Sequence, residues 1–229
     1  MDDRAKASSW YNEALDDGAS DPCVNDTDDR CGRREFPEKA IIVATTTDLY
    51  IFDAKDNSQW MNFDENSTSD YLVTGNMMPH RPSDYISSVF ALNGKIYTTS
   101  PDGFGLTFAD FLADEGGMIW NSAFYLYGAS GAGTISQRNG GLGFRTSGKT
   151  PRIVIDTTTD VSAAVINNKT YVAVATDAGV SVINETDQRV INYTNTAGAD
   201  AYSVQLTKDG TLYFSEAKND ELAVFTNIK

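Results

Sequence analysis

The stretch from Asn167 to Glu185, NNKTYVAVATDAGVSVINE, limits the fold of this chain more than any other. Its first half alternates as an extended strand does, so that Tyr171 lies on one face and Val172 on the other. Residues 177–179, Asp-Ala-Gly, are typical of a turn, and residues 180–183 alternate again. The stretch therefore predicts a β-hairpin from the middle of a sheet.

Copies of this hairpin recur along the chain. Residues 39–64, KAIIVATTTDLYIFDAKDNSQWMNFD, align with it through Lys39 and Lys169, and the shared plan is strand, turn, strand, acidic turn, strand. Residues 89–110, VFALNGKIYTTSPDGFGLTFAD, align through Lys95 and Tyr97, which match Lys169 and Tyr171. These copies predict that one strand pattern is used repeatedly.

A further copy lies near the end of the sequence. In residues 203–225, SVQLTKDGTLYFSEAKNDELAVF, Tyr213 takes the Tyr171 position after a turn of the type that Asp209-Gly210 favours. The copies begin near residues 39, 86, 161 and 202. A repeated unit of four short antiparallel strands predicts an all-β, β-propeller-like fold of about four repeats, with insertions between strands.

The first copy lacks its innermost strand, and the last ends at Phe225 without its outermost strand. Two interpretations stay open: strands from both ends close one small ring, or the chain is one portion of a longer propeller. The alternative fold is a β-sandwich or meander whose hairpins resemble one another only because all hairpins do.

The domain organisation has two parts, an arm at residues 1–36 and a β domain at residues 37–229. Trp10, Tyr11 and Leu15 fall on one apolar stripe of a short helix, which we expect to dock onto another protein. Cys23 and Cys31, the only cysteines, are eight residues apart in a polar loop. A disulfide between them and two free thiols are both open.

Composition excludes some classes of function. The 229 residues carry a formal net charge of −14, so a phosphate backbone would be repelled and nucleic acid is not an expected partner. No apolar run has the roughly 18 residues that a membrane helix needs, and MDDRAKASSW lacks the pattern of a secretion signal. We expect no membrane insertion, and export within a longer precursor stays open.

Residues 143–150, GFRTSGKT, match the phosphate-binding pattern G-x-x-x-x-G-K-[ST], but no helix pattern follows them. Residues 151–156 alternate instead as a strand, and residues 128–150 read as a long glycine-rich surface loop. His80, the only histidine, has no serine or cysteine partner suited to a triad. We therefore predict no catalytic residue and no cofactor.

Other candidate sites have simpler explanations. Trp60 sits in an alternating strand, which makes burial in a sheet core more plausible than stacking on a sugar, and Trp120, Tyr125 and Tyr127 could serve either purpose. The acidic loop around Asp26 lacks the spacing of a calcium-binding EF-hand, so no metal site is predicted. The N-x-[ST] sequons are only weak evidence for glycosylation or secretion, because a chain rich in Asn, Ser and Thr contains several by chance; they begin at Asn25, Asn66, Asn168, Asn184 and Asn192.

Several phrases together carry a resemblance: REFPEKAIIVATTTDLYIFDAKDNSQWMNF, SVFALNGKIYTTSPDGFGLTFADFLAD, TISQRNGGLGF and TYVAVATDAGVSVIN. They resemble propeller-like structural proteins of marine tailed phages, such as tail-fibre proteins. The similarity covers roughly residues 34–229. It implies a non-enzymatic virion protein in an oligomeric assembly, with other virion proteins and a host surface glycan or protein as partners.

The alternatives are a secreted, extracellular microbial propeller that binds glycans and a carboxylate-dependent glycoside hydrolase. With 32 Asp and Glu residues, the sequence singles out no catalytic pair. The regular hairpins are expected to build the scaffold. Recognition is expected in the less regular segments 64–84 and 128–150.

Overall fold

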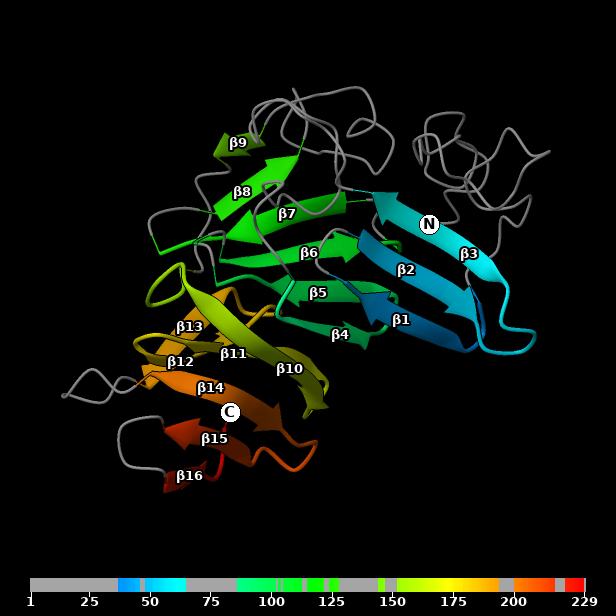
Figure 1. The fold of residues 1–229 in the computed structure, drawn as a ribbon. Helices are drawn as coiled ribbons and strands as arrows, with labels where there is room; N and C mark the ends of the chain where they lie inside the picture. The colour runs from blue at the N-terminus through cyan, green and yellow to red at the C-terminus, as the bar shows by residue number, and fades with distance from the viewer. Residues whose placement is uncertain are drawn as a thin grey trace.

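A computed structural model describes these parts of the chain: residues 37–45, 48–64, 86–101, 103, 105–112, 115–121, 124–127, 144–146, 152–193, 200–216 and 221–228. They form four antiparallel sheets in chain order, and no helix lies among them (Figure 1). This confirms the all-β prediction.

Every sheet is a meander in which each strand pairs with the next in the sequence. The first sheet contains β1 (Ala40–Ala44), β2 (Asp48–Asp53) and β3 (Gln59–Asp64). The second contains β4 (Ser88–Leu92), β5 (Lys95–Thr99), β6 (Leu106–Asp110), β7 (Glu115–Ile119), β8 (Phe124–Tyr127) and β9 (Phe144–Thr146). The third contains β10 (Thr158–Ile166), β11 (Lys169–Thr176), β12 (Gly179–Asn184) and β13 (Arg189–Tyr193). The fourth contains β14 (Ala201–Leu206), β15 (Leu212–Glu216) and β16 (Glu221–Phe225).

Two hairpins turn through the same backbone conformation. Asn93 and Gly94 join β4 to β5 with φ of 53° and 75°, and Asn167 and Asn168 join β10 to β11 with φ of 50° and 62°. Positive φ at both central residues gives a turn whose twist matches that of the flanking strands, and asparagine and glycine tolerate it best. The aligned turn residues thus fix the same register in two repeats.

The sheets pack face to face, each on the next. One core lies between the first and second sheets around Trp60 and Ile96, which are fully buried. A second core joins the second and third sheets through Tyr97 and Val172, and a third joins the third and fourth through Tyr171 and Phe214. Tyr171 and Val172 therefore face different neighbours, as the alternation predicts, and this stacking of sheets is propeller-like.

The first strands of three sheets run side by side. β10 contacts β4 on one side and β14 on the other. Asp160 of β10 ties them together, because its carboxylate accepts hydrogen bonds from the Ser88 hydroxyl at 2.6 Å and from the Val204 N–H at 2.8 Å. These three strands are the innermost of their sheets.

Among the described residues, the two terminal sheets are each one strand short, as predicted. β1 aligns with β11, a second strand, so the described part of the first sheet has no counterpart of β10. The described part of the fourth sheet has no counterpart of β13. Among the described residues, no hydrophobic core joins the first sheet to the fourth. The described sheets form a series with two outward faces.

The prediction of a long surface loop over residues 128–150 is wrong at Phe144–Thr146. These residues form β9, which pairs with β8 so that Thr146 lies opposite Tyr125. Phenylalanine and threonine favour extended structure, and the edge of β8 offers unpaired backbone groups.

The strand predicted over residues 151–156 is also absent from its described part, 152–156. The Val154 N–H donates to the Ser181 hydroxyl, whereas the Asp156 carbonyl accepts from Gly105 N–H. Ile153 is buried in the core between the second and third sheets. The segment bonds to two sheets at once, so it cannot follow one ladder.

Candidate functional site

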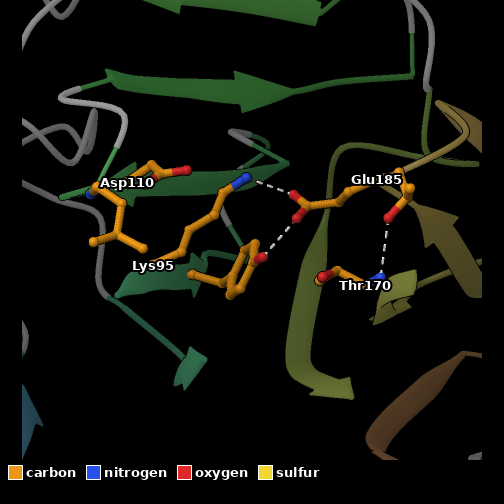
Figure 2. A network of polar contacts seen from close by, with 7 residues as sticks. Lys95, Asp110, Thr170 and Glu185 are labelled. Carbon is orange, nitrogen blue, oxygen red and sulfur yellow. Dashed lines mark hydrogen bonds and ion pairs between the residues drawn. The ribbon is translucent and has the colours of Figure 1, made fainter. Parts of the chain in front are cut away.

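Two polar clusters at aligned positions form the candidate site, and the first lies between the second and third sheets (Figure 2). Lys95 and Tyr97 are two residues apart on β5 and share one face of that strand. The Lys95 ammonium pairs with Glu185 Oε1 at 2.6 Å, and the Tyr97 hydroxyl donates to Glu185 Oε2 at 2.8 Å. One carboxylate therefore binds both side chains.

Local structure sets the position of each partner. Glu185 directly follows β12, and its N–H donates to the Thr170 carbonyl at 3.0 Å. The Lys95 ammonium lies 4.2 Å from the centre of the Phe108 ring, in a cation–π arrangement. Both charged side chains are largely buried, with 16% and 20% of their surface exposed. The cluster is a polar link within an apolar interface.

Burial controls the chemistry of Tyr97. It raises the pKa of the hydroxyl far above the usual tyrosine range, and the Glu185 charge, the hydrogen bond to Glu185 and the Asp110 charge add to this. A tyrosine in this state remains a hydrogen-bond donor and does not act as a base at neutral pH. The cluster is suited to holding two sheets together.

The second cluster lies on the third sheet. Lys169, the counterpart of Lys95, pairs with Asp187 of its own sheet at 2.6 Å. This pair is exposed to solvent. The hydrogen bond from Lys169 lowers the pKa of Asp187, and Asp187 in turn raises the pKa of Lys169. Here the lysine stays within its sheet and makes no link to a neighbour.

A pocket of about 530 Å³ opens beside this second cluster. Its polar and charged lining contains two guanidinium groups and three carboxamides, and three aliphatic side chains complete the wall. The lining residues are Arg152, Tyr171, Val182, Asn184, Asp187, Gln188, Arg189, Val190, Ile191 and Asn192. Pockets of this size hold small-molecule ligands in other proteins.

Tyr171 is the counterpart of Tyr97, and its side chain is 3% exposed. In the part of the chain that the structure describes, its hydroxyl makes no hydrogen bond. Neither Arg152 nor Arg189 forms an ion pair within that part. The pocket thus combines a tyrosine hydroxyl with two guanidinium groups, and the Arg189 charge also helps to lower the pKa of Asp187.

Most site residues proposed from the sequence lie outside the described residues. These are the docking residues Trp10, Tyr11 and Leu15 and the cysteines Cys23 and Cys31. His80, the acidic loop around Asp26 and nearly all of the segments 64–84 and 128–150 also lie outside. The docking role, the disulfide and the recognition role of those segments remain predictions.

The described residues test some of the other predictions. Trp60 is fully buried and its ring meets Phe111 edge to face, which confirms its place in the core. Asn184 is 7% exposed and bonds to Asp187, so the folded chain hides this sequon. Within the described ranges, no group of three or more His, Cys, Asp or Glu side chains could hold a metal ion, and no helix could cross a membrane.

Sequence reasoning did not find the pocket or the role of Glu185. The alignment of Lys95 and Tyr97 with Lys169 and Tyr171 was a usable signal, because it marks equivalent places on two sheets. Glu185, the partner of Lys95 and Tyr97, comes from a turn of the neighbouring sheet. Such a contact cannot be read from strand periodicity.

No protein-family model matches the chain, and no curated protein matches it. Among solved structures, it is similar to the computationally designed Ika4 protein, at 10% identity and a TM-score of 0.43 over 83% of this chain and 87% of that one. It is also similar to the β-propeller domain of Cps50 (Swd1) from Myceliophteria thermophila, at 10% identity and a TM-score of 0.44 over 82% of this chain and 47% of that one. These likenesses are loose, and it is the face-to-face packing of the four sheets that makes this fold propeller-like.

Proposed function

We propose that this chain is a non-enzymatic structural and adhesive component of a phage particle, of the tail-fibre or attachment type. The resemblance in residues 34–229 suggests the particle. The structural observation that carries the proposal is the pair of outward apolar faces on the terminal sheets.

These faces are what a unit of a larger assembly requires. On the first sheet, Ile41 and Val43 are 45% and 40% exposed, on the face opposite the core. On the fourth sheet, Leu222 and Val224 are 65% and 50% exposed. Exposed apolar faces of this kind mark interaction surfaces, and burying them against other virion proteins would be favourable.

The pocket fits the other two candidate functions, glycoside hydrolysis and glycan binding, to different degrees. A glycoside hydrolase needs two carboxyl groups flanking the scissile bond, and the described pocket lining contains one, Asp187, which is bonded to Lys169. A secreted glycan-binding propeller needs only a polar pocket, which the lining around Arg152 supplies. Glycan binding is therefore the second candidate.

Quantitative mass spectrometry of washed particles from the culture that carries this sequence tests the proposal. We expect the chain in a fixed ratio to the major virion proteins. Its absence from particles, while the same culture contains it in free form, would contradict a virion role.

Substitutions on the outward face sharpen this test. Leu222→Asp together with Val224→Asp should reduce incorporation at least about tenfold, because two charges would be buried at the interface. Leu112→Asp is the matched control, since Leu112 is 71% exposed in a turn of the second sheet. Equal incorporation of the double variant and the control would show that this face is not used.

A further inference from the structure

The pocket on the third sheet lies beside Tyr171. At the equivalent position on the second sheet, Tyr97 binds the carboxylate of Glu185. Tyr97 donates its hydroxyl to Glu185, which follows β12 of the next sheet. Tyr171 occupies the aligned position. In the next sheet Tyr213 lies opposite Val224, as Tyr171 lies opposite Asn184, so the counterpart of Glu185 is Phe225. The fourth sheet therefore supplies no carboxylate at this place.

The Tyr171 hydroxyl supports the same conclusion. Its side chain is nearly fully buried, lines the pocket, and makes no hydrogen bond within the part of the chain that the structure describes. The hydroxyl oxygen itself is not sealed from solvent, so it opens into the pocket and can donate a hydrogen bond to an acceptor that enters there.

The charge of the pocket selects the kind of acceptor. Arg152 and Arg189 both line it, in a chain whose net charge is −14. The one carboxylate in the described lining, Asp187, is bonded to Lys169 at 2.6 Å and to the Asn184 amide at 3.1 Å. The lining as a whole favours an anion.

The rest of the lining fits a sugar better than an extended acidic peptide. Gln188 offers a carboxamide to hydroxyl groups, and the Ile191 side chain, which is 47% exposed, offers apolar contact to the C–H face of a ring. The volume of about 530 Å³ is that of a compact pocket, and it suits a ligand of one or two sugar rings.

We propose that this pocket binds a carboxylate-bearing sugar, with Arg152 and Arg189 pairing with the carboxylate and Tyr171 donating a hydrogen bond to it. The inference is independent of the particle role, because a single chain carries the whole pocket. A virion protein and a free extracellular protein would bind the sugar alike.

The probe is sodium glucuronate, titrated into the full chain and followed by NMR shifts of the Tyr171 and Gln188 amide resonances. We expect saturable shifts from glucuronate and none from glucuronamide, which has the same shape without the charge. Arg152→Gln and Arg189→Gln should each weaken binding about tenfold, and Tyr171→Phe about threefold to tenfold. Lys55→Gln, an equal loss of charge on the exposed β2–β3 turn, should bind as the parent does.

Three results would overturn the proposal. The first is the absence of saturable binding by glucuronate, and the second is equal binding of glucuronamide. The third is tighter binding of hexaglutamate than of glucuronate, which would identify the pocket as a site for acidic peptides. A thermal melt of each variant shows whether it is folded, so that lost binding is not confused with lost structure.

Discussion

Two interfaces offer the same pair of residue types but bond them differently. One lies between the second and third sheets, and the other lies between the third and fourth sheets. Both offer a lysine and a tyrosine two residues apart, Lys95 and Tyr97 in one case and Lys169 and Tyr171 in the other. At the first interface Glu185 binds both side chains. At the second, the lysine pairs within its own sheet and the tyrosine faces a pocket.

The difference shows that the same strand pattern can surround a bonded tyrosine in one repeat and a pocket in the next. Glu185 binds Lys95 and Tyr97 at the first interface, whereas Phe225 stands at the corresponding place of the second. Because one residue of the next sheet decides whether the tyrosine is bonded, the same strand pattern can hold two sheets together at one place and leave a tyrosine hydroxyl facing a pocket at another.

The largest predicted effect is at Glu185. Glu185→Ala leaves the mostly buried Lys95 ammonium and the Tyr97 hydroxyl without their partner, so the free energy of unfolding should fall by about 3 kcal/mol. Urea denaturation measures this. Asp187→Ala is the matched control in the same turn, and an equal loss in both variants would show that the two interfaces do not differ.

The second prediction concerns alkaline pH. Folding raises the pKa of Tyr97 above its usual value of 10.0, so the unfolded chain loses this proton before the folded chain does. Above about pH 10 the folded state therefore binds more protons, and stability should fall by up to about 1.4 kcal/mol per pH unit from this one group. Tyr97→Phe should show a shallower decline, measured by urea denaturation between pH 9 and 11. An unchanged slope would contradict the buried, protonated tyrosine.

The third prediction compares the two tyrosines. Tyr97→Phe removes a hydrogen bond to a charged group and should cost about 1.5 kcal/mol, whereas Tyr171→Phe removes no bond within the described chain and should cost less than about 0.5 kcal/mol. Both variants keep the aromatic ring in its core. Equal costs would mean that Tyr171 has a partner and that the pocket is not open to a ligand.

The smallest predicted effect is at the exposed pair. Asp187→Asn should change the free energy of unfolding by less than about 0.5 kcal/mol, because solvent screens the pair with Lys169. The difference from the parent should shrink further in 0.5 M NaCl. A decrease in the free energy of unfolding of more than about 1 kcal/mol that salt does not reduce would contradict this prediction, because it would show that the exposed pair stabilises the fold.

Strand periodicity predicted much of this fold. The alternation of Tyr171 with Val172 placed these side chains in different cores, and the shared lysine and tyrosine positions revealed the repeats. The short first and fourth sheets followed from the same alignment. These features depend on local patterns, which a sequence contains.

The candidate site depended on contacts between segments far apart in the sequence. Lys95 and Glu185 are separated by 90 residues. Arg152 lines the pocket from a segment that the sequence pattern predicted to be a strand. That segment bonds to two sheets, and β9 forms because the edge of β8 is available. In each case the neighbouring sheet, and not the local pattern, determines the structure.

The most direct test of the difference between the two interfaces is a double-mutant cycle on Lys95→Met and Glu185→Gln, measured by urea denaturation. The structure predicts a coupling energy of at least about 1.5 kcal/mol, because the two side chains meet at 2.6 Å in a largely buried place. A coupling energy near zero would contradict the account, since Glu185 would then not link the second and third sheets.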